Sequence, residues 1–184
     1  KRIRRRLFCA FAHDERIRIS SFRAAIGSGD AVLRECYCRL PIRRLRNDEE
    51  WESVDFEDFL DAVATSDGVT FLIEAPAGSG KSACLREMEL VLLQKFEQVS
   101  GRLPLPVSLK SHDDNSILKG IKAALGSHSL PDSLLEVLLH NGHFILLLDA
   151  LTENEAAPEK WADFSRSEIG RTTSLILAIR PSDN

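Results

Sequence analysis

The sequence predicts an α/β domain in which a mainly parallel β-sheet lies between layers of helices. Short apolar runs alternate with helical patterns from residue 55 onward. Residues 144–148 are continuously apolar, which is typical of a parallel strand covered on both faces. A glycine-containing segment at 75–80 separates one predicted strand from the next predicted helix. The 184 residues suffice for one domain with a sizeable core.

Two helices and a strand are predicted between residues 55 and 101. Asp55 can cap a helix that ends at a turn over 66–68. Residues 69–74 form a short apolar run, which predicts a buried strand before the loop at 75–80. The helix that begins at Lys81 carries apolar residues on one face as far as Gly101. They are Leu85, Met88, Leu92, Phe96 and Val99.

The next three elements are a strand and two helices. Residues 103–110 predict a strand, and Asn115 or Ser116 can cap a helix that Gly126 ends. Pro131 suits the first turn of another helix, which ends at 141–142. Four leucines of that helix are expected to face inward, namely Leu134, Leu135, Leu138 and Leu139.

The remaining predicted elements lie after residue 142 and in the N-terminal 50 residues. Residues 143–149 predict a strand, 158–164 a short helix, and 172–180 a last strand that Pro181 terminates. The N-terminal 50 residues are less regular, with a helix suggested over 13–26 and an extended segment over 34–40.

The composition, 43% hydrophobic and 28% charged, is that of an ordinary globular domain. The apolar run at 144–148 is too short to span a bilayer, and residues 7–12 are too short for a secretory signal. We therefore expect a cytoplasmic protein without a membrane partner. The four cysteines and five histidines show no metal-ligand spacing, which favours reduced structural thiols.

Charge is distributed unevenly along the chain. Residues 1–46 hold 13 Lys and Arg against 4 Asp and Glu, whereas the rest holds 11 against 24. Contact of the basic segment with nucleic acid or acidic lipid is one interpretation. We favour a solvated linker or the tail of an upstream domain over residues 1–50, with the core over 51–184. The sequence lacks an initial Met and stops soon after a strand, which suggests part of a larger protein.

The segment 74–82 predicts a phosphate-binding loop, or P-loop. Backbone N–H groups of a glycine-containing turn can surround phosphate oxygens, and the next helix directs its N-terminal dipole at them. Lys81 would reach the β and γ phosphates, and the Ser82 hydroxyl would ligate Mg²⁺. The nucleotide contacts are expected from Pro76, Ala77, Gly78, Ser79, Gly80, Lys81, Ser82 and Ala83. The competing interpretation is a Gly/Ser turn with a surface lysine.

A second group of candidate residues follows the predicted strands. Asp149 ends an apolar strand, at the sheet edge where α/β proteins bind ligands, and could hold Mg²⁺ through its water shell. Glu153 is expected in the following loop, where it could polarise an attacking water. Arg180 ends the last strand and could contact the γ-phosphate or stabilise the transition state. An exposed loop acid and a surface arginine are the alternatives.

With these residues assembled, the chain resembles the NACHT family of STAND (signal-transducing) ATPases. The resemblance covers roughly residues 37–181 and rests mainly on the segments 71–82, 103–109, 144–153 and 175–181. Three departures are visible. Ala75 stands where the P-loop usually opens with Gly. The family's Asp-Gly-x-Asp-Glu is Asp149-Ala150-Leu151-Thr152-Glu153 here, and its Thr-Ser-Arg-Pro is Ala178-Ile179-Arg180-Pro181.

The resemblance implies a five-stranded P-loop sheet in which one strand separates the Walker A strand, before the P-loop, from the Walker B strand, which ends in Asp149. It implies ATP or ADP with Mg²⁺ as ligands. It also implies a switch: ADP holds a closed monomer, and ATP permits homo-oligomerisation of the full-length protein and signalling, often in immunity. Oligomerisation and sensing of a ligand, which stays unknown here, use modules outside the nucleotide core. Because Thr152 replaces a carboxylate and the sensor strand lacks hydroxyls, we expect slow hydrolysis.

Three other functions are weighed against this one. An AAA+ ATPase usually has Glu directly after the Walker B Asp, where this chain has Ala150. A nucleoside kinase would show an arginine-rich lid segment after Asp149, which we do not find. A non-hydrolysing scaffold, in which ATP only holds the fold, is distinguished from both ATPases by turnover.

Overall fold

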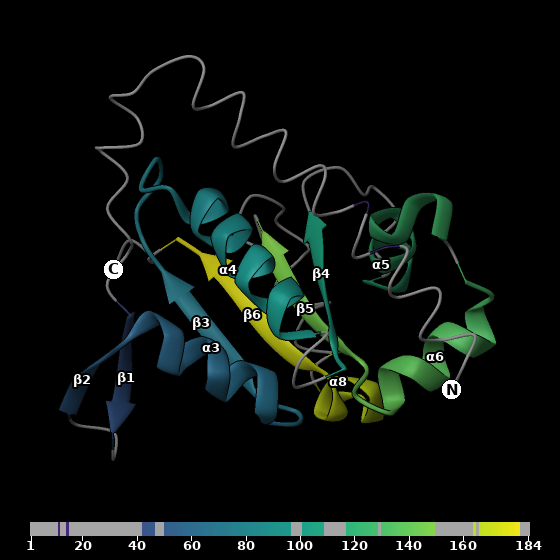
Figure 1. Cartoon of the computed structure of the whole chain (residues 1–184), viewed down its shortest axis with the longest axis horizontal. Helices are drawn as coiled ribbons and strands as arrows, with labels where there is room; N and C mark the ends of the chain where they lie inside the picture. The colour runs from purple at the N-terminus through teal and green to yellow at the C-terminus, as the bar shows by residue number, and fades with distance from the viewer. Residues whose placement is uncertain are drawn as a thin grey trace.

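A four-stranded parallel sheet forms the centre of the domain (Figure 1). The computed structural model describes residues 11, 14, 42–46, 50–96, 101–108, 117–128, 130–149, 164 and 166–180. The strands are β3 (Thr70–Glu74), β4 (Leu103–Ser108), β5 (Phe144–Asp149) and β6 (Ser174–Ile179). They lie in the order β3-β6-β5-β4, so β6 separates β3 from β5.

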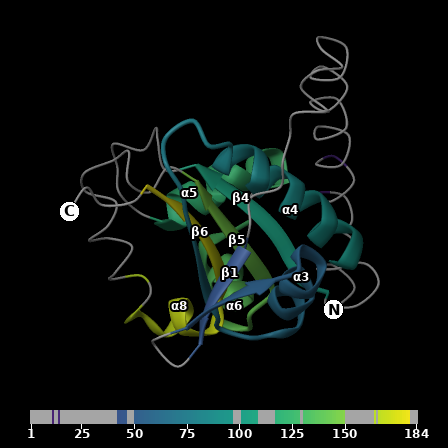
Figure 2. The same cartoon turned by 90° about the vertical axis from the view of Figure 1, so that its left-hand side faces the viewer.

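Helices cover both faces of this sheet, as the alternating side chains of its central strands require. On one face, Ile145, Leu147, Ile176 and Ala178 pack against α3 (Phe56–Thr65) and α4 (Lys81–Lys95). Figure 2 shows these two helices on one side of the strands.

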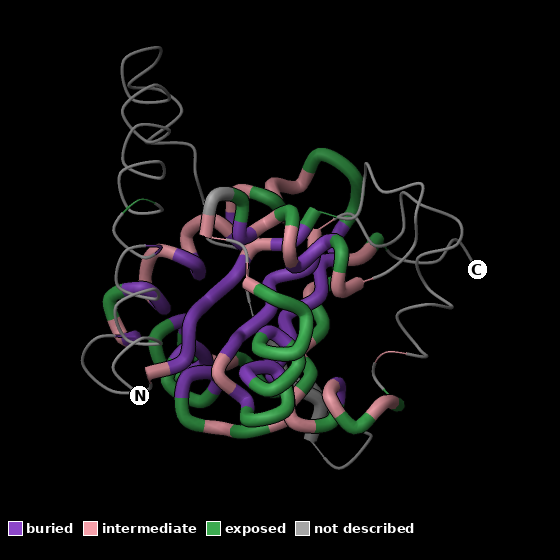
Figure 3. The backbone as a smooth tube through the Cα atoms, turned by 90° about the vertical axis from the view of Figure 1, so that its right-hand side faces the viewer, coloured by how far each residue is buried: buried purple, intermediate pink, exposed green. Residues whose placement is uncertain are grey.

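The alternate residues of the same strands point to the other face. Phe144, Leu146, Leu148, Leu175 and Leu177 pack there against α5 (Ile117–Leu125) and α6 (Asp132–His140). The short helix α8 (Glu168–Thr172) contributes a partly buried residue to this cluster. The strands β4, β5 and β6 are accordingly largely buried at the centre of the backbone trace in Figure 3. The predicted α/β architecture with a parallel sheet is confirmed.

Most predicted elements lie where the sequence places them. The Asp55 side chain accepts a hydrogen bond of 2.8 Å from the Glu57 N–H and so caps α3. The 3₁₀ turn η2 (Gly126–His128) follows α5, which ends at Leu125 as predicted. Residues 13, 15–26, 34–40, 97–100, 109–116 and 158–163, which carry other parts of the predicted elements, lie outside the described residues.

Three expectations are wrong. The strand predicted at 69–74 is not buried, because β3 lies at the edge of the described sheet and its residues are exposed or half-buried. Leu134 does not face inward: α6 buries Leu135, Leu138 and Leu139 against the sheet, which leaves Leu134 40% exposed on its outer side. The last strand begins at Ser174 rather than at 172, because Thr172 is the last residue of α8. Thr173 ends that helix, and its hydroxyl donates to the Ile169 carbonyl at 2.8 Å.

A pair of strands and one short helix were not predicted at all. The strands β1 (Ile42–Arg46) and β2 (Glu50–Val54) form an antiparallel pair, although the sequence there is rich in charged residues. The other element is α8, whose five residues are too few to show helical periodicity. The resemblance implied five strands in the main sheet, and the described residues contain four.

Arg102 connects several elements at the amino end of the sheet, opposite the carboxyl ends of the strands. The sequence did not indicate this role. Its side chain is buried, and it donates to the carbonyls of Gly142 (2.9 Å), Val63 (3.4 Å) and Ser66 and to the Ser174 hydroxyl (2.6 Å). Burial lowers the pKa of the guanidinium, and Asp67 at 3.6 Å partly offsets this. Arg102 thereby ties α3 to the starts of β5 and β6.

None of the helices in the described part of the chain is long and apolar enough to cross a membrane.

Candidate functional site

Three adjacent strands end at one edge of the sheet, and each is followed there by a residue of the predicted site. Glu74 of β3 pairs with Ile179 of β6, so the P-loop and Arg180 leave the sheet side by side. On the other side of β6, Leu148 pairs with Leu177, which places Asp149 level with Ala178. This is the carboxyl edge, where open parallel sheets bind ligands.

The predicted P-loop, residues 75–80, connects β3 directly to α4. The Ala75 N–H donates to the Ile179 carbonyl at 3.3 Å, so this residue continues the pairing of β3 with β6. Ser79 then closes a turn on Pro76, whose carbonyl accepts from the Ser79 hydroxyl at 2.8 Å. Ala75, which stands where the resembled family has Gly, is therefore the last residue that pairs with β6. The turn of the loop begins after it.

Gly78 and Gly80 give the loop its shape. Their φ angles of 75° and 88° lie in the left-handed region, which other L-residues rarely adopt. A Cβ placed on either residue would meet no atom within 4 Å. The glycines are therefore required by the backbone conformation, and the space beside them is open to a ligand.

The Lys81 side chain folds back over the loop. Its ammonium donates to the carbonyls of Ala75 at 2.6 Å and Pro76 at 2.7 Å. These two contacts place the positive charge at the mouth of the loop. A phosphate oxygen bound by Lys81 would compete with the same carbonyls for its three donors.

Helix α4 begins immediately behind the loop. Gly80 is its N-cap, and the Cys84 N–H donates to the Gly80 carbonyl at 2.9 Å as an early helical bond. The N–H groups of Ser82 and Ala83 precede this bond and so have no acceptor inside the helix. The first turn contains no acidic residue. This end of α4 therefore presents N–H donors and a positive dipole to the loop.

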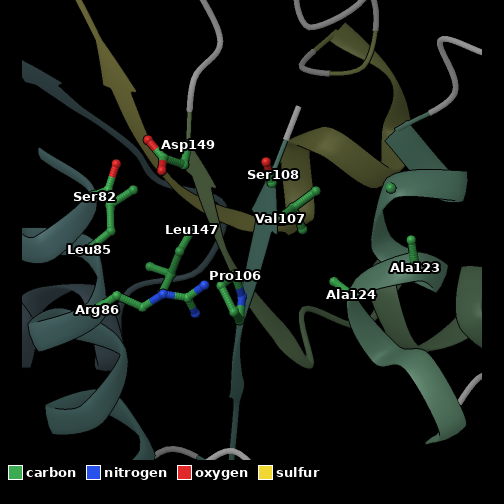
Figure 4. Close-up of a pocket in the computed structure, with 11 residues that line it drawn as sticks. Ser82, Leu85, Arg86, Pro106, Val107, Ser108, Ala123, Ala124, Leu147 and Asp149 are labelled. Carbon is green, nitrogen blue, oxygen red and sulfur yellow. The ribbon is translucent and has the colours of Figure 1, made fainter. Parts of the chain in front are cut away.

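Ser82 and Asp149 line the same pocket, which has a volume of about 270 Å³ (Figure 4). Ser82 comes from the first turn of α4, and Asp149 from the end of β5. The remaining wall is formed by Leu85, Arg86, Pro106, Val107, Ser108, Gly120, Ala123, Ala124 and Leu147. The two predicted magnesium ligands, which are 67 positions apart in the sequence, thus line one pocket.

Arg86 is a pocket residue that the sequence reasoning missed. It lies one helical turn after Ser82, a spacing that places both on one face of α4. Its guanidinium donates to the Glu89 carboxylate at 2.8 Å, and Glu89 is fully buried. The ion pair compensates the buried carboxylate and keeps a cationic side chain in the pocket wall.

The structure describes most of the other predicted site residues, but not all of them. Pro76 and Ala77 are exposed on the loop, and Arg180 is exposed directly after β6. Glu153 lies outside the described residues, so its place relative to the pocket stays a prediction. Within the described part of the chain, no group of three or more His, Cys, Asp or Glu side chains could hold a metal ion. The Cys84 side chain is buried and forms no disulfide.

No protein-family model matches this sequence, and a search of curated proteins gives no significant match.

Proposed function

We propose that this chain binds ATP with Mg²⁺ and acts as a slow, switch-type ATPase domain of the NACHT kind. The observation that carries the proposal is the shared pocket of Ser82 and Asp149, next to a P-loop that joins a parallel strand to a helix. The alternative, a Gly/Ser turn with a surface lysine, does not explain why the loop lies next to a carboxylate at this edge of the sheet.

The loop fits a polyphosphate chain. Gly78 and Gly80 leave open space, the N–H groups at the start of α4 supply donors, and Lys81 supplies charge. The first turn of α4 contains no acidic residue, so no carboxylate there would repel the phosphate charges.

The pocket fits a magnesium ion that arrives with the nucleotide. The Ser82 hydroxyl and the Asp149 carboxylate are oxygen ligands, and Mg²⁺ takes few of these from a protein while it keeps several waters. Mg²⁺ would supply charge neutralisation between the β and γ phosphates. Asp149 would hold the ion's water shell, and Ser82 would contact the ion directly.

The strand order favours a NACHT-type switch over a P-loop protein whose Walker A and Walker B strands are neighbours. β6 lies between β3 and β5, as the resemblance implied. In such a switch, the nucleotide state would control homo-oligomerisation of the full-length cytoplasmic protein. Glu153 would polarise the attacking water, and Arg180 would stabilise the developing charge, since it follows the strand between the loop and Asp149.

Competition binding tests the proposal and its choice of base. A fluorescent ATP analogue is bound to the protein with Mg²⁺ and displaced by ATP, ADP or GTP. We expect displacement by ATP and ADP at concentrations at least tenfold lower than by GTP. Equal displacement by GTP would refute the adenine preference, and absence of analogue binding would refute the proposed function as a whole.

A further inference from the structure

Ser108 and Asp149 are partners across two adjacent parallel strands. Ser108 ends β4, Asp149 ends β5, and the two residues are in register. Neighbouring strands lie about 4.8 Å apart, and side chains in register point to the same face of a parallel sheet. The hydroxyl and the carboxylate are therefore neighbours at the carboxyl edge.

The alternation of the strands identifies the face that they share. Val107 and Leu148 belong to the cluster beneath α5 and α6, so the residues that follow them point to the opposite face. That face carries α4, and Ser108 and Asp149 both line the pocket that Ser82 borders. Figure 4 shows the two strand ends together, with Ser82 across the pocket from Ser108.

We propose that Ser108 is a positioning residue of the magnesium site: its hydroxyl holds a water of the cation's shell against the Asp149 carboxylate. The inference rests on the proposed function, because the cation is expected to arrive with ATP. It adds a residue that the sequence motifs do not include.

The chemistry of the site explains why a hydroxyl is useful there. Asp149 is the one carboxylate among the described pocket residues, so most ligands of a cation would be waters. Waters in such a shell need partners, and outer-shell partners orient the ligands and tune metal affinity. A serine both donates and accepts without adding charge, and its exposed position at the end of β4 lets a water reach it.

The test compares the Mg²⁺ dependence of ATP binding in wild type, Ser108→Ala, Ser108→Thr and Asp149→Asn. Ser133→Ala, on the exposed side of α6, is the matched control. Affinity for ATP is measured in EDTA and then across a Mg²⁺ titration. Melting temperatures without ligand verify that each variant folds.

We expect Ser108→Ala to keep the wild-type affinity for ATP in EDTA. It should need about tenfold more Mg²⁺ to reach half of the increase in ATP affinity that Mg²⁺ produces. Ser108→Thr retains the hydroxyl and should need within about twofold of the wild-type concentration. A structural role would instead lower the melting temperature and both affinities together, which would overturn the assignment.

The remaining outcomes separate this inference from the proposed function. If Asp149→Asn weakens the magnesium-dependent gain while Ser108→Ala matches Ser133→Ala and wild type, the role of Ser108 is refuted and the proposed function stands. If wild type itself binds no ATP with Mg²⁺, the proposed function fails and the role of Ser108 fails with it.

Discussion

Lys81 is the residue whose surroundings a nucleotide would change most. It donates to the carbonyls of Ala75 and Pro76, so its charge already lies over the loop that would hold the phosphates. A hydrogen bond that involves a charged group usually contributes about 1.5–3 kcal/mol, and less where the group is half-exposed, as Lys81 is. Loss of the side chain should therefore affect the fold modestly and phosphate binding strongly, which makes Lys81→Ala an informative variant.

Glu153 carries the prediction about chemistry. Water is a poor nucleophile, and a positioned carboxylate contributes about 10²–10⁴-fold by orienting and deprotonating it. Glu153→Gln should lower turnover at least tenfold in a phosphate-release assay while ATP affinity stays nearly unchanged. If wild type shows no turnover above the Lys81→Ala background, the catalytic role is excluded and the non-hydrolysing scaffold takes its place.

At the level of elements, Arg102 links α3 to the turns that begin β5 and β6. Its removal leaves buried carbonyls at Val63 and Gly142 and the Ser174 hydroxyl without this donor. We expect Arg102→Met to lower the free energy of unfolding by about 3 kcal/mol, because each buried acceptor left without a donor costs about 1–3 kcal/mol. Urea unfolding measures this, with the exposed Arg171→Met on α8 as control. Equal stability of the two variants would contradict the linking role.

The sequence predicted best those elements whose signals are local. The apolar run of β5 and the cap at Asp55 require no knowledge of the rest of the chain, and the P-loop depends only on spacing. The β1–β2 pair was missed because its residues are largely charged, and their pairing partners are set by contacts between strands. Leu134 was misplaced because periodicity does not say which side of α6 meets the sheet.

The same distinction applies to the site. Lys81, Ser82 and Asp149 could be proposed from the sequence because each belongs to a short motif. Ser108 could not, since its proposed role depends on the register of β4 against β5. Arg86 lies four residues after Ser82, and that spacing could have suggested a shared helix face. Placement of the two motifs around one pocket depends on β6 lying between β3 and β5.

At the scale of the whole molecule, we expect this chain to be a monomer even with ATP. The large hydrophobic side chains exposed in the described part of the chain are Leu72, Leu134 and Val137. A stable interface usually buries about 1,200–2,000 Å² of surface, which these three side chains do not supply. Light scattering at micromolar concentration should give a mass near 20.5 kDa. A stable ring would contradict the view that assembly depends on modules outside the nucleotide core.

Thermal unfolding with and without ATP and Mg²⁺ tests the central claim, that the P-loop binds a nucleotide, most directly. Lys81→Ala removes the charge over the loop, and Lys119→Ala removes an exposed lysine of α5 as the matched control. At a hundredfold excess over the dissociation constant, ligand adds about 2.7 kcal/mol, or about 5–10 °C for a domain of this size. We predict that rise for wild type and Lys119→Ala and none for Lys81→Ala. Equal shifts in wild type and Lys81→Ala, or no shift in any of the three, would contradict the account.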